Sequence, residues 1–214
     1  MIFLKTAEDI AVMREGGIIL RRVADELAAM AQEGVRLKEL DTRARALIKK
    51  SGGTPAFLGY KPAWARRRYQ ASLCASINDV VVHGVPNARV LNNGDVCKID
   101  LGLYYKGFYT DVALTKGIGT ISEEAQRLIQ VTRDALTLAI NYCWPGKTLG
   151  DIGFAITSYV RKNGFHVVKG LLAMALAVSF MKIQWLIIKE DPARECDLRQ
   201  AWCLRLNQWL LWGM

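Results

Sequence analysis

The sequence predicts a protein of mixed α and β structure, in which helices accompany a β-hairpin that carries two acids. Between Val96 and Thr115, apolar and polar residues alternate around Asp100 and Asp111, as they do in strands. Before them, residues from Thr6 to about Glu33 and from Leu37 to Ser51 repeat apolar side chains at helical spacing. The first of these helices is expected to break at its paired glycines, 16 and 17.

The two acids of the hairpin suggest a metal site. Since 111 − 100 = 11 is odd, Asp100 and Asp111 would face opposite ways in one straight strand. A reversal near Tyr105 and Lys106, or a glycine bulge, would bring them together, and Gly102 and Gly107 are expected to relax the backbone there. Two adjacent carboxylates repel each other unless a cation or a proton lies between them. A divalent metal satisfies them, and two solvated strand acids are the alternative.

Further elements follow on both sides of the hairpin. Thr54 to Tyr69 is expected to be a loop rich in aromatic residues and arginine, and Ala71 to Ile77 a short buried strand. Ser122 to about Tyr142 is predicted as a helix, because Ser122 suits its N-cap and two glutamates follow it. A second helix is expected from about Thr148 to Lys162, then a strand from Phe165 to Val168.

Several separate blocks of sequence identify a family. In order and spacing, the chain resembles the type I methionine aminopeptidases in the blocks KTAEDIAVMREGG, FLGYKPAWARRRY, SLCASIND, VVHGVP and GDVCKIDLGLYYKGFYTDVALT. The resemblance runs from Met1 to about Gly170. It implies the pita-bread (creatinase/aminopeptidase-like) α+β fold, a pseudosymmetric arrangement with metal ions between its halves, of which the C-terminal half is incomplete here.

The resemblance also implies a set of site residues. Asp100 and Asp111 would be ligands of two divalent metal ions, Co, Mn, Fe or Zn. His83 would be a catalytic histidine on the substrate side that stabilises the tetrahedral intermediate without binding metal. The methionine side chain would lie in a pocket whose walls include Phe57, Tyr60 and Cys74. Val80 and Thr110 differ from the residues common in the family, but neither removes a ligand.

The sequence changes character after about Gly170. Residues 1–170 are predicted to be the methionine aminopeptidase-like catalytic domain, and residues 171–214 an aberrant tail without histidine. If Ala173 to Trp185 is encoded with synonymous codons and read from one base earlier, the translation is GHGIGRFIHENPM, which resembles the missing family segment. Arg199 to Gly213, read in the same way, gives AGMVFAIEPMVVMG. We therefore expect a frameshift between Gly170 and Leu172, in the gene or in its sequencing.

Composition limits the partners and the compartment. The net charge of +9 comes with one compact basic run, Arg66 to Arg68, for which a ribosomal contact and a plain exposed loop are both open. Lys5, Glu8 and Asp9 interrupt any secretory signal, and the five cysteines form no CxxC pair, so a reducing cytoplasm fits best. Leu171 to Ile188 is apolar enough for a membrane span by hydropathy, but the family has none. We expect a cytoplasmic monomer without a membrane segment.

The expected function follows from the resemblance. The family removes the initiator methionine from nascent proteins by metal-dependent hydrolysis, and its intact site includes second-half histidines and glutamates that this chain lacks. The 214-residue chain is therefore expected to be inactive. Two alternatives remain: a non-catalytic ribosome- or RNA-associated protein of the same fold, and another pita-bread exopeptidase with dipeptidase or proline specificity.

Overall fold

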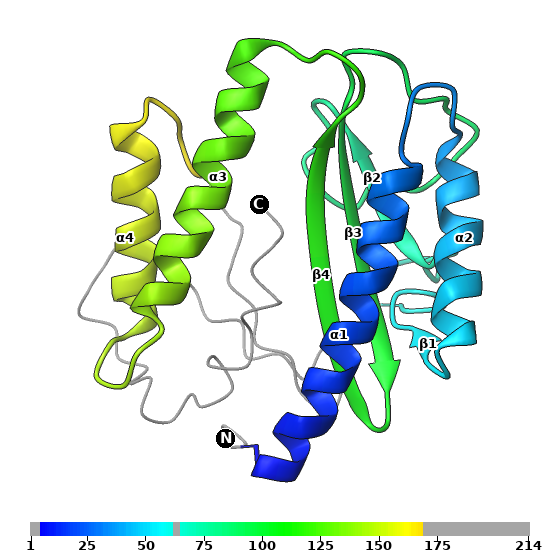
Figure 1. Ribbon diagram of the computed structural model, residues 1–214, viewed down its shortest axis with the longest axis horizontal. Coiled ribbons are helices and arrows are strands. Elements are labelled where there is room, and N and C mark those ends of the chain that lie inside the picture. Colours follow the sequence, from blue (N-terminus) through cyan, green and yellow to red (C-terminus); the bar gives the residue numbers. More distant parts are fainter. Residues whose placement is uncertain (1–4, 62–64, 169–214) are drawn as a thin grey trace.

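The computed structural model describes residues 5–61 and 65–168. Within them, two helices are followed by the strands of a four-stranded antiparallel sheet and then by two further helices (Figure 1). The elements in chain order are α1 (Ala7–Met30), α2 (Leu37–Lys50), β1 (Thr54–Pro55), β2 (Leu73–Ile77), β3 (Val96–Tyr105), β4 (Phe108–Gly117), α3 (Glu123–Tyr142) and α4 (Leu149–Lys162).

Strand β3 is the centre of the sheet. Along one edge, β3 pairs first with β2 and then, near its C-terminal end, with the short β1. Along the other edge it pairs with β4 over its whole length. The β3–β4 hairpin turns at Lys106 and Gly107, whose φ angles of 46° and 93° are those a tight primed turn requires. The predicted reversal is confirmed, and because the pairing is continuous from Val96 to Gly117, no bulge is involved.

Gly102 does not serve the turn, contrary to the sequence prediction. It pairs with Asp111 in the middle of the hairpin, and its backbone is not in the left-handed region. A Cβ at this position would lie 2.9 Å from Cβ of Ala56 and from Cε1 of Phe57. Gly102 is therefore small because the loop after β1 packs directly over it.

Helices α1 and α2 cover one face of the sheet (Figure 1). Their apolar stripes pack against alternate residues of β3, Cys97, Ile99, Leu101 and Leu103, which are completely buried. The predicted break in α1 is wrong, because the helix runs without interruption through Gly16 and Gly17. A Cβ on Gly16 would be 3.4 Å from Cγ2 of Thr110 in β4, so the glycine lets helix and strand approach closely.

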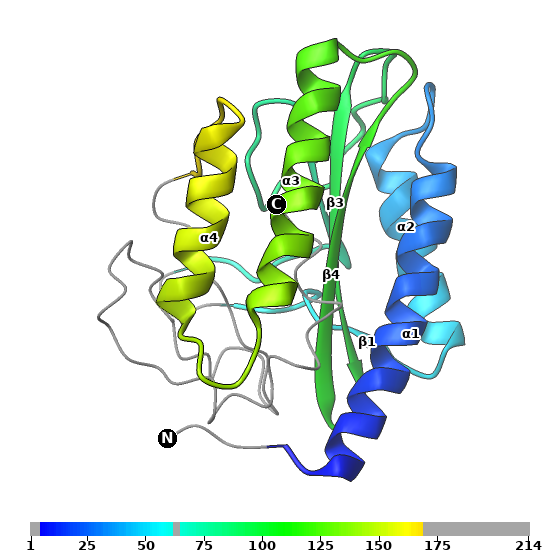
Figure 2. The ribbon, with the colours of Figure 1, turned by 60° about the vertical axis from the view of Figure 1, so that its left-hand side comes forward.

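Helices α3 and α4 form a separate antiparallel pair on the other side of β4 from α1 (Figures 1 and 2). Their contact has its own small core around Ala135, Ala139, Leu149, Ile152 and Ile156. Ser122 and Thr148 cap the two helices as their side chains predict.

The strand predicted from Phe165 to Val168 is not formed. These residues have no regular structure, and no strand of residues 5–61 and 65–168 pairs with them. Gly164, with φ +82°, ends the helix, and the Phe165 N–H donates a hydrogen bond back to the Val160 carbonyl. The tail from residue 171, including the apolar stretch from Leu171 to Ile188, lies outside the described residues. No helix of the described ranges has both the length and the apolar character of a bilayer span.

Candidate metal centre and catalytic site

Asp100 and Asp111 lie side by side on the face of the sheet opposite α1 and α2. In the register of the hairpin, Asp111 is paired with Gly102 and Asp100 with Ala113, so the two acids are diagonal neighbours on one face. Their carboxyl groups are within hydrogen-bond contact. The sequence prediction that the hairpin brings these two acids together is confirmed.

This placement is electrostatically costly for the carboxyl groups. Burial raises the pKa of Asp100 to about 6. Burial and the adjacent charge of Asp100 raise the pKa of Asp111 well above its usual value. The Oδ1 atom of Asp111 is buried and accepts no hydrogen bond within the described part of the chain. An orphaned carboxylate oxygen beside a second carboxyl is the donor set that a hard divalent cation or a shared proton would satisfy.

The described residues provide one side of a metal site. Two carboxylates converge, but no third His, Cys, Asp or Glu of residues 5–61 and 65–168 joins them. A metal ion commonly takes four or more ligands in proteins, so Asp100 and Asp111 fit a metal and leave most of its coordination sphere to other groups.

Of the three residues predicted to line the methionine pocket, Cys74 and Phe57 lie beside these acids. Cys74 is the cross-strand partner of Asp100, and burial raises the pKa of its thiol to about 12. The ring of Phe57 lies over Gly102, the partner of Asp111. Tyr60 closes the same loop, since its N–H donates to the Phe57 carbonyl. An aromatic ring and a neutral thiol thus border the two carboxylates, and their pocket role stays a prediction.

His83 lies beyond the free edge of β2, in an exposed loop. Its φ of +60° is in the left-handed region, which is uncommon for a histidine. The next residue, Gly84, is hydrogen-bonded to Ala75 of β2. From the usual strand spacing, the backbone of His83 is roughly 10 Å from β3, two strand spacings away. The structure thus places the histidine on the same side of the hairpin as Cys74, and its catalytic role stays a prediction.

Two residues that sequence reasoning did not single out support this region. The single O–H of Tyr69 is shared between the carbonyls of Leu73 (2.9 Å) and Gly84 (3.3 Å), and burial raises the pKa of Tyr69. The Ser76 hydroxyl accepts a hydrogen bond from the Gly84 N–H. No pattern in the sequence pointed to them, because both act on backbone groups that only the fold brings close.

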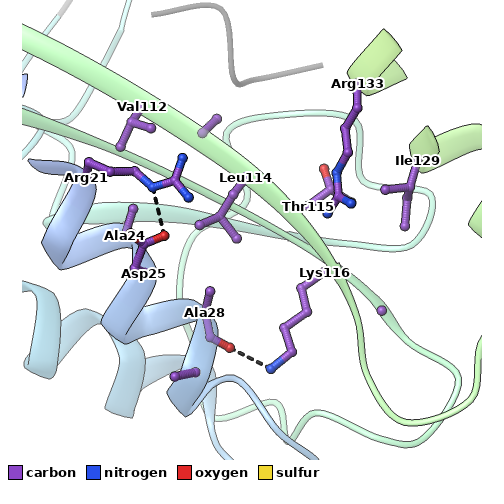
Figure 3. A pocket seen from close by; sticks show the side chains of 13 residues that line it. Arg21, Ala24, Asp25, Ala28, Val112, Leu114, Thr115, Lys116, Ile129 and Arg133 are labelled. Atoms are coloured by element: carbon purple, nitrogen blue, oxygen red, sulfur yellow. Dashed lines mark hydrogen bonds and ion pairs between the residues drawn. The ribbon is translucent and has the colours of Figure 1, made fainter. Parts of the chain in front are cut away.

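A groove of about 430 Å³ between α1, β4 and α3 is a different region (Figure 3). None of the predicted site residues lines it. Two of its cationic side chains already have local partners: Arg21 pairs with Asp25 at 2.8 Å, and the Lys116 ammonium donates to the Ala28 carbonyl at 2.6 Å. The groove is therefore a contact region between helix and sheet, and the carboxylate pair is the better candidate for chemistry.

Comparison with known proteins gives one family. The model of metallopeptidase family M24 matches residues 11–182. A methionine aminopeptidase from Aquifex aeolicus is 42% identical over 168 residues, 78% of this chain and 65% of that protein. Methionine aminopeptidase 1 of Bacillus subtilis is 37% identical over 79% of this chain and 66% of its own length. The crystal structure of methionine aminopeptidase from Rickettsia prowazekii superposes with a TM-score of 0.85 at 31% identity, covering 92% of this chain and 77% of that one.

The chain belongs to metallopeptidase family M24, and the predicted pita-bread fold is confirmed. The relatives reported above are named methionine aminopeptidases, which assigns the chain to the metallo-exopeptidases of this family. The chain spans about two thirds of the length of the curated relatives, 66% of the Bacillus subtilis protein.

Proposed function

We propose that the chain carries the N-terminal half of a site that removes the initiator methionine from nascent proteins. The observation that carries the proposal is the pair of adjacent buried carboxyls, with the Oδ1 atom of Asp111 left without a partner in the described residues. That the relatives are named methionine aminopeptidases supports the substrate.

Each residue has a distinct role in this proposal. Asp100 and Asp111 would hold divalent metal ions, Co, Mn, Fe or Zn, which when bound acidify water and polarise the scissile carbonyl. The two carboxylates would orient that centre on rigid strands. His83 would donate a hydrogen bond to the scissile amide region as negative charge develops on the carbonyl oxygen.

The side-chain pocket accounts for the choice of methionine. Phe57, Tyr60 and Cys74 would form apolar and sulfur-containing walls next to the carboxylates, which suit a flexible thioether. With its pKa at about 12, the Cys74 thiol stays neutral at physiological pH, so it adds no third negative charge beside Asp100.

The 214-residue chain itself is proposed to release no methionine. Two carboxylates alone hold metal weakly, and the two histidines of the sequence are His83 and the exposed His166. We infer that the reading frame shifts between Gly170 and Leu172, and that one base added there restores the segment GHGIGRFIHENPM. Sequencing the source DNA across the codons for Phe165 to Gln184 tests this inference. An extra base there would show that the present reading frame is a sequencing error, and an unchanged sequence would show that the gene itself is frameshifted.

The activity is tested by comparing the 214-residue chain with the frame-restored chain on the peptide Met-Ala-Ser, with Mn²⁺ or Co²⁺ added. We expect methionine release by the frame-restored chain only, and its loss in the Asp100→Asn variant of that chain. Release by the mass-verified 214-residue chain would contradict the proposed inactivity. No release by the frame-restored chain would contradict the proposed activity, and hydrolysis of Xaa-Pro peptides instead would establish another exopeptidase of the fold.

The setting proposed for this function is the cytoplasm, with the protein as a monomer. The exposed Arg66 and Arg67 are the residues through which a ribosome contact would form. Sedimentation of the purified chain with ribosomes at low salt, lost in a variant with both arginines replaced by glutamine, tests the contact. Ribosome binding without metal or activity would favour the non-catalytic alternative.

A further inference from the structure

We propose that Ser76 is a positioning residue for His83. Its buried hydroxyl holds the backbone of Gly84 in place. Because Gly84 directly follows His83, this contact also fixes the position of the His83 imidazole. The inference rests on the proposed role of His83, but the contact itself is independent of that role.

The polar backbone groups of Gly84 are both bound to β2. The Ser76 Oγ accepts a hydrogen bond from the Gly84 N–H at 3.0 Å, and the Ala75 N–H donates to the Gly84 carbonyl at 2.8 Å. The Tyr69 hydroxyl donates to the same carbonyl at 3.3 Å. Since Ser76 is only 3% exposed, no water competes easily for its hydroxyl. The histidine loop is therefore fastened to the sheet at the residue directly after His83.

This fastening is needed because the loop is held in an unfavourable conformation. The positive φ of His83 is unfavourable for a residue with a side chain. The neighbouring side chains Val81 and Val82 are 49% and 39% exposed, so they contribute little packing that would hold it. A Cβ on residue 84 would lie 2.3 Å from the Ala75 carbonyl oxygen, so only glycine allows this approach to β2.

The other end of the loop is fixed separately, so the histidine end depends on the contacts of Gly84, among which Ser76 binds the N–H. Asn78, with φ 55°, exchanges two hydrogen bonds with the backbone of Val96, at 2.9 and 2.8 Å. Its side-chain amide also donates to Asp95 at 2.8 Å. Ser76 is two residues from Cys74 on the same face of β2, so the fastening starts on the face that carries Asp100.

The first test uses the 214-residue chain and compares Ser76→Ala with Ser72→Ala. Ser72 is a matched control, because it is also fully buried and its hydroxyl also accepts one hydrogen bond, from Arg45 at 3.1 Å. We expect hydrogen exchange of the Gly84 amide to become at least tenfold faster in Ser76→Ala and to stay within twofold in Ser72→Ala. The exchange rate of the Ile99 amide, in the core, is measured in both variants and corrects the Gly84 rates for changes in global stability.

Imidazole NMR signals give the second readout, since the chain has two histidines. The His83 signal is expected to move or broaden in Ser76→Ala, and to return in Ser76→Thr, which keeps the hydroxyl, while His166 stays unchanged. If Ser76→Ala does not fold, Tyr69→Phe is the second variant. It removes the hydroxyl that contacts the carbonyls of Leu73 and Gly84 but keeps the Ser76 bond, so it is expected to speed Gly84 exchange by a smaller factor. Unchanged Gly84 exchange and an unchanged His83 signal in these variants would overturn the proposal.

Kinetics of the frame-restored chain separate this inference from the proposed function. There, Ser76→Ala is expected to lower kcat at least tenfold with KM within about twofold, and Ser72→Ala to leave both constants unchanged. If the unsubstituted frame-restored chain is inactive, the proposed function fails, and the Gly84 exchange alone then decides the role of Ser76. If it is active and Ser76→Ala has the same kcat, the positioning role is wrong.

Discussion

Replacing Asp100 by asparagine is expected to stabilise the metal-free chain at neutral pH. The pKa of Asp100 is about 6 in the folded chain, compared with 3.8 for the free group. Because each tenfold difference in protonation is worth about 1.4 kcal/mol, keeping this carboxylate ionised in the fold costs about 3 kcal/mol. Asparagine has nearly the same shape and no charge, and its amide needs a partner of its own, so we expect a net gain of about 1 to 3 kcal/mol at pH 7.5.

The pH dependence has a definite sign. The pKa of Asp100 is raised in the folded state, so between pH 3.8 and about 6 the folded chain holds more protons than the unfolded chain. The stability that this proton provides is complete below pH 3.8 and is lost as the pH rises through about 6. The raised pKa of Asp111 acts in the same direction. The gain from Asp100→Asn is therefore expected to be near zero at pH 4 and largest above pH 6.5.

Urea unfolding followed by circular dichroism at pH 4, 5.5 and 7.5 measures this effect. Glu33→Gln removes a charge from an exposed position and serves as the control, with less than about 0.5 kcal/mol expected at any pH. Millimolar Mn²⁺ should raise the midpoint of the unsubstituted chain at pH 7.5 and leave that of Asp100→Asn unchanged. An Asp100→Asn variant whose stability follows that of the unsubstituted chain at all three pH values would refute the reasoning.

Three further perturbations test other parts of the structure. The thiol of Cys74 is buried and has a pKa of about 12, so it should react with iodoacetamide at pH 8 more than a hundredfold more slowly in the folded chain than in urea. Mass mapping measures the two rates, and equal rates would contradict the burial of the thiol. Gly102→Ala should lower the free energy of unfolding in urea by about 1 to 3 kcal/mol, because its Cβ meets Phe57. Gly107→Ala lies in open space but at φ +93°, so it should lower that free energy by about 1 kcal/mol, and equal losses would count against the Phe57 contact. Lys116→Met should lower stability by about 1 kcal/mol, because the ammonium caps the last turn of α1 at the Ala28 carbonyl; no change in the thermal midpoint would show that the bond contributes nothing.

The sequence predicted best where one local rule dominates. The helices from Ser122 and from Thr148 start at side chains that cap them, and both begin where predicted. The hairpin was predictable because its residues alternate between two faces and Gly107 permits a tight turn. Local patterns also placed Asp100 and Asp111 on neighbouring strands, since a reversal near Tyr105 fixes their register within one or two residues.

The errors and omissions arise where tertiary contacts decide. Gly16 resembles a helix breaker in sequence, yet it marks the place where α1 packs against Thr110, and Gly102 is small because Phe57 lies over it. The segment after Gly164 has strand-like residues but no partner strand in the described ranges, and a strand forms only where a ladder is available. Backbone contacts such as the one between Ser76 and Gly84 leave no periodic signal at all.

The electrostatic cost of burying Asp100 beside Asp111 links metal binding to the stability of the hairpin. A fold selected for stability alone would not bury Asp100 against Asp111, because each raises the cost of ionising the pair at neutral pH. Their shared face is instead bordered by a neutral thiol at Cys74 and an aromatic ring at Phe57, which give them no compensating positive charge. Within the described chain the pair is destabilising, so its placement is best explained by a cation that offsets the repulsion. The same cation would then couple metal binding to the stability of the hairpin.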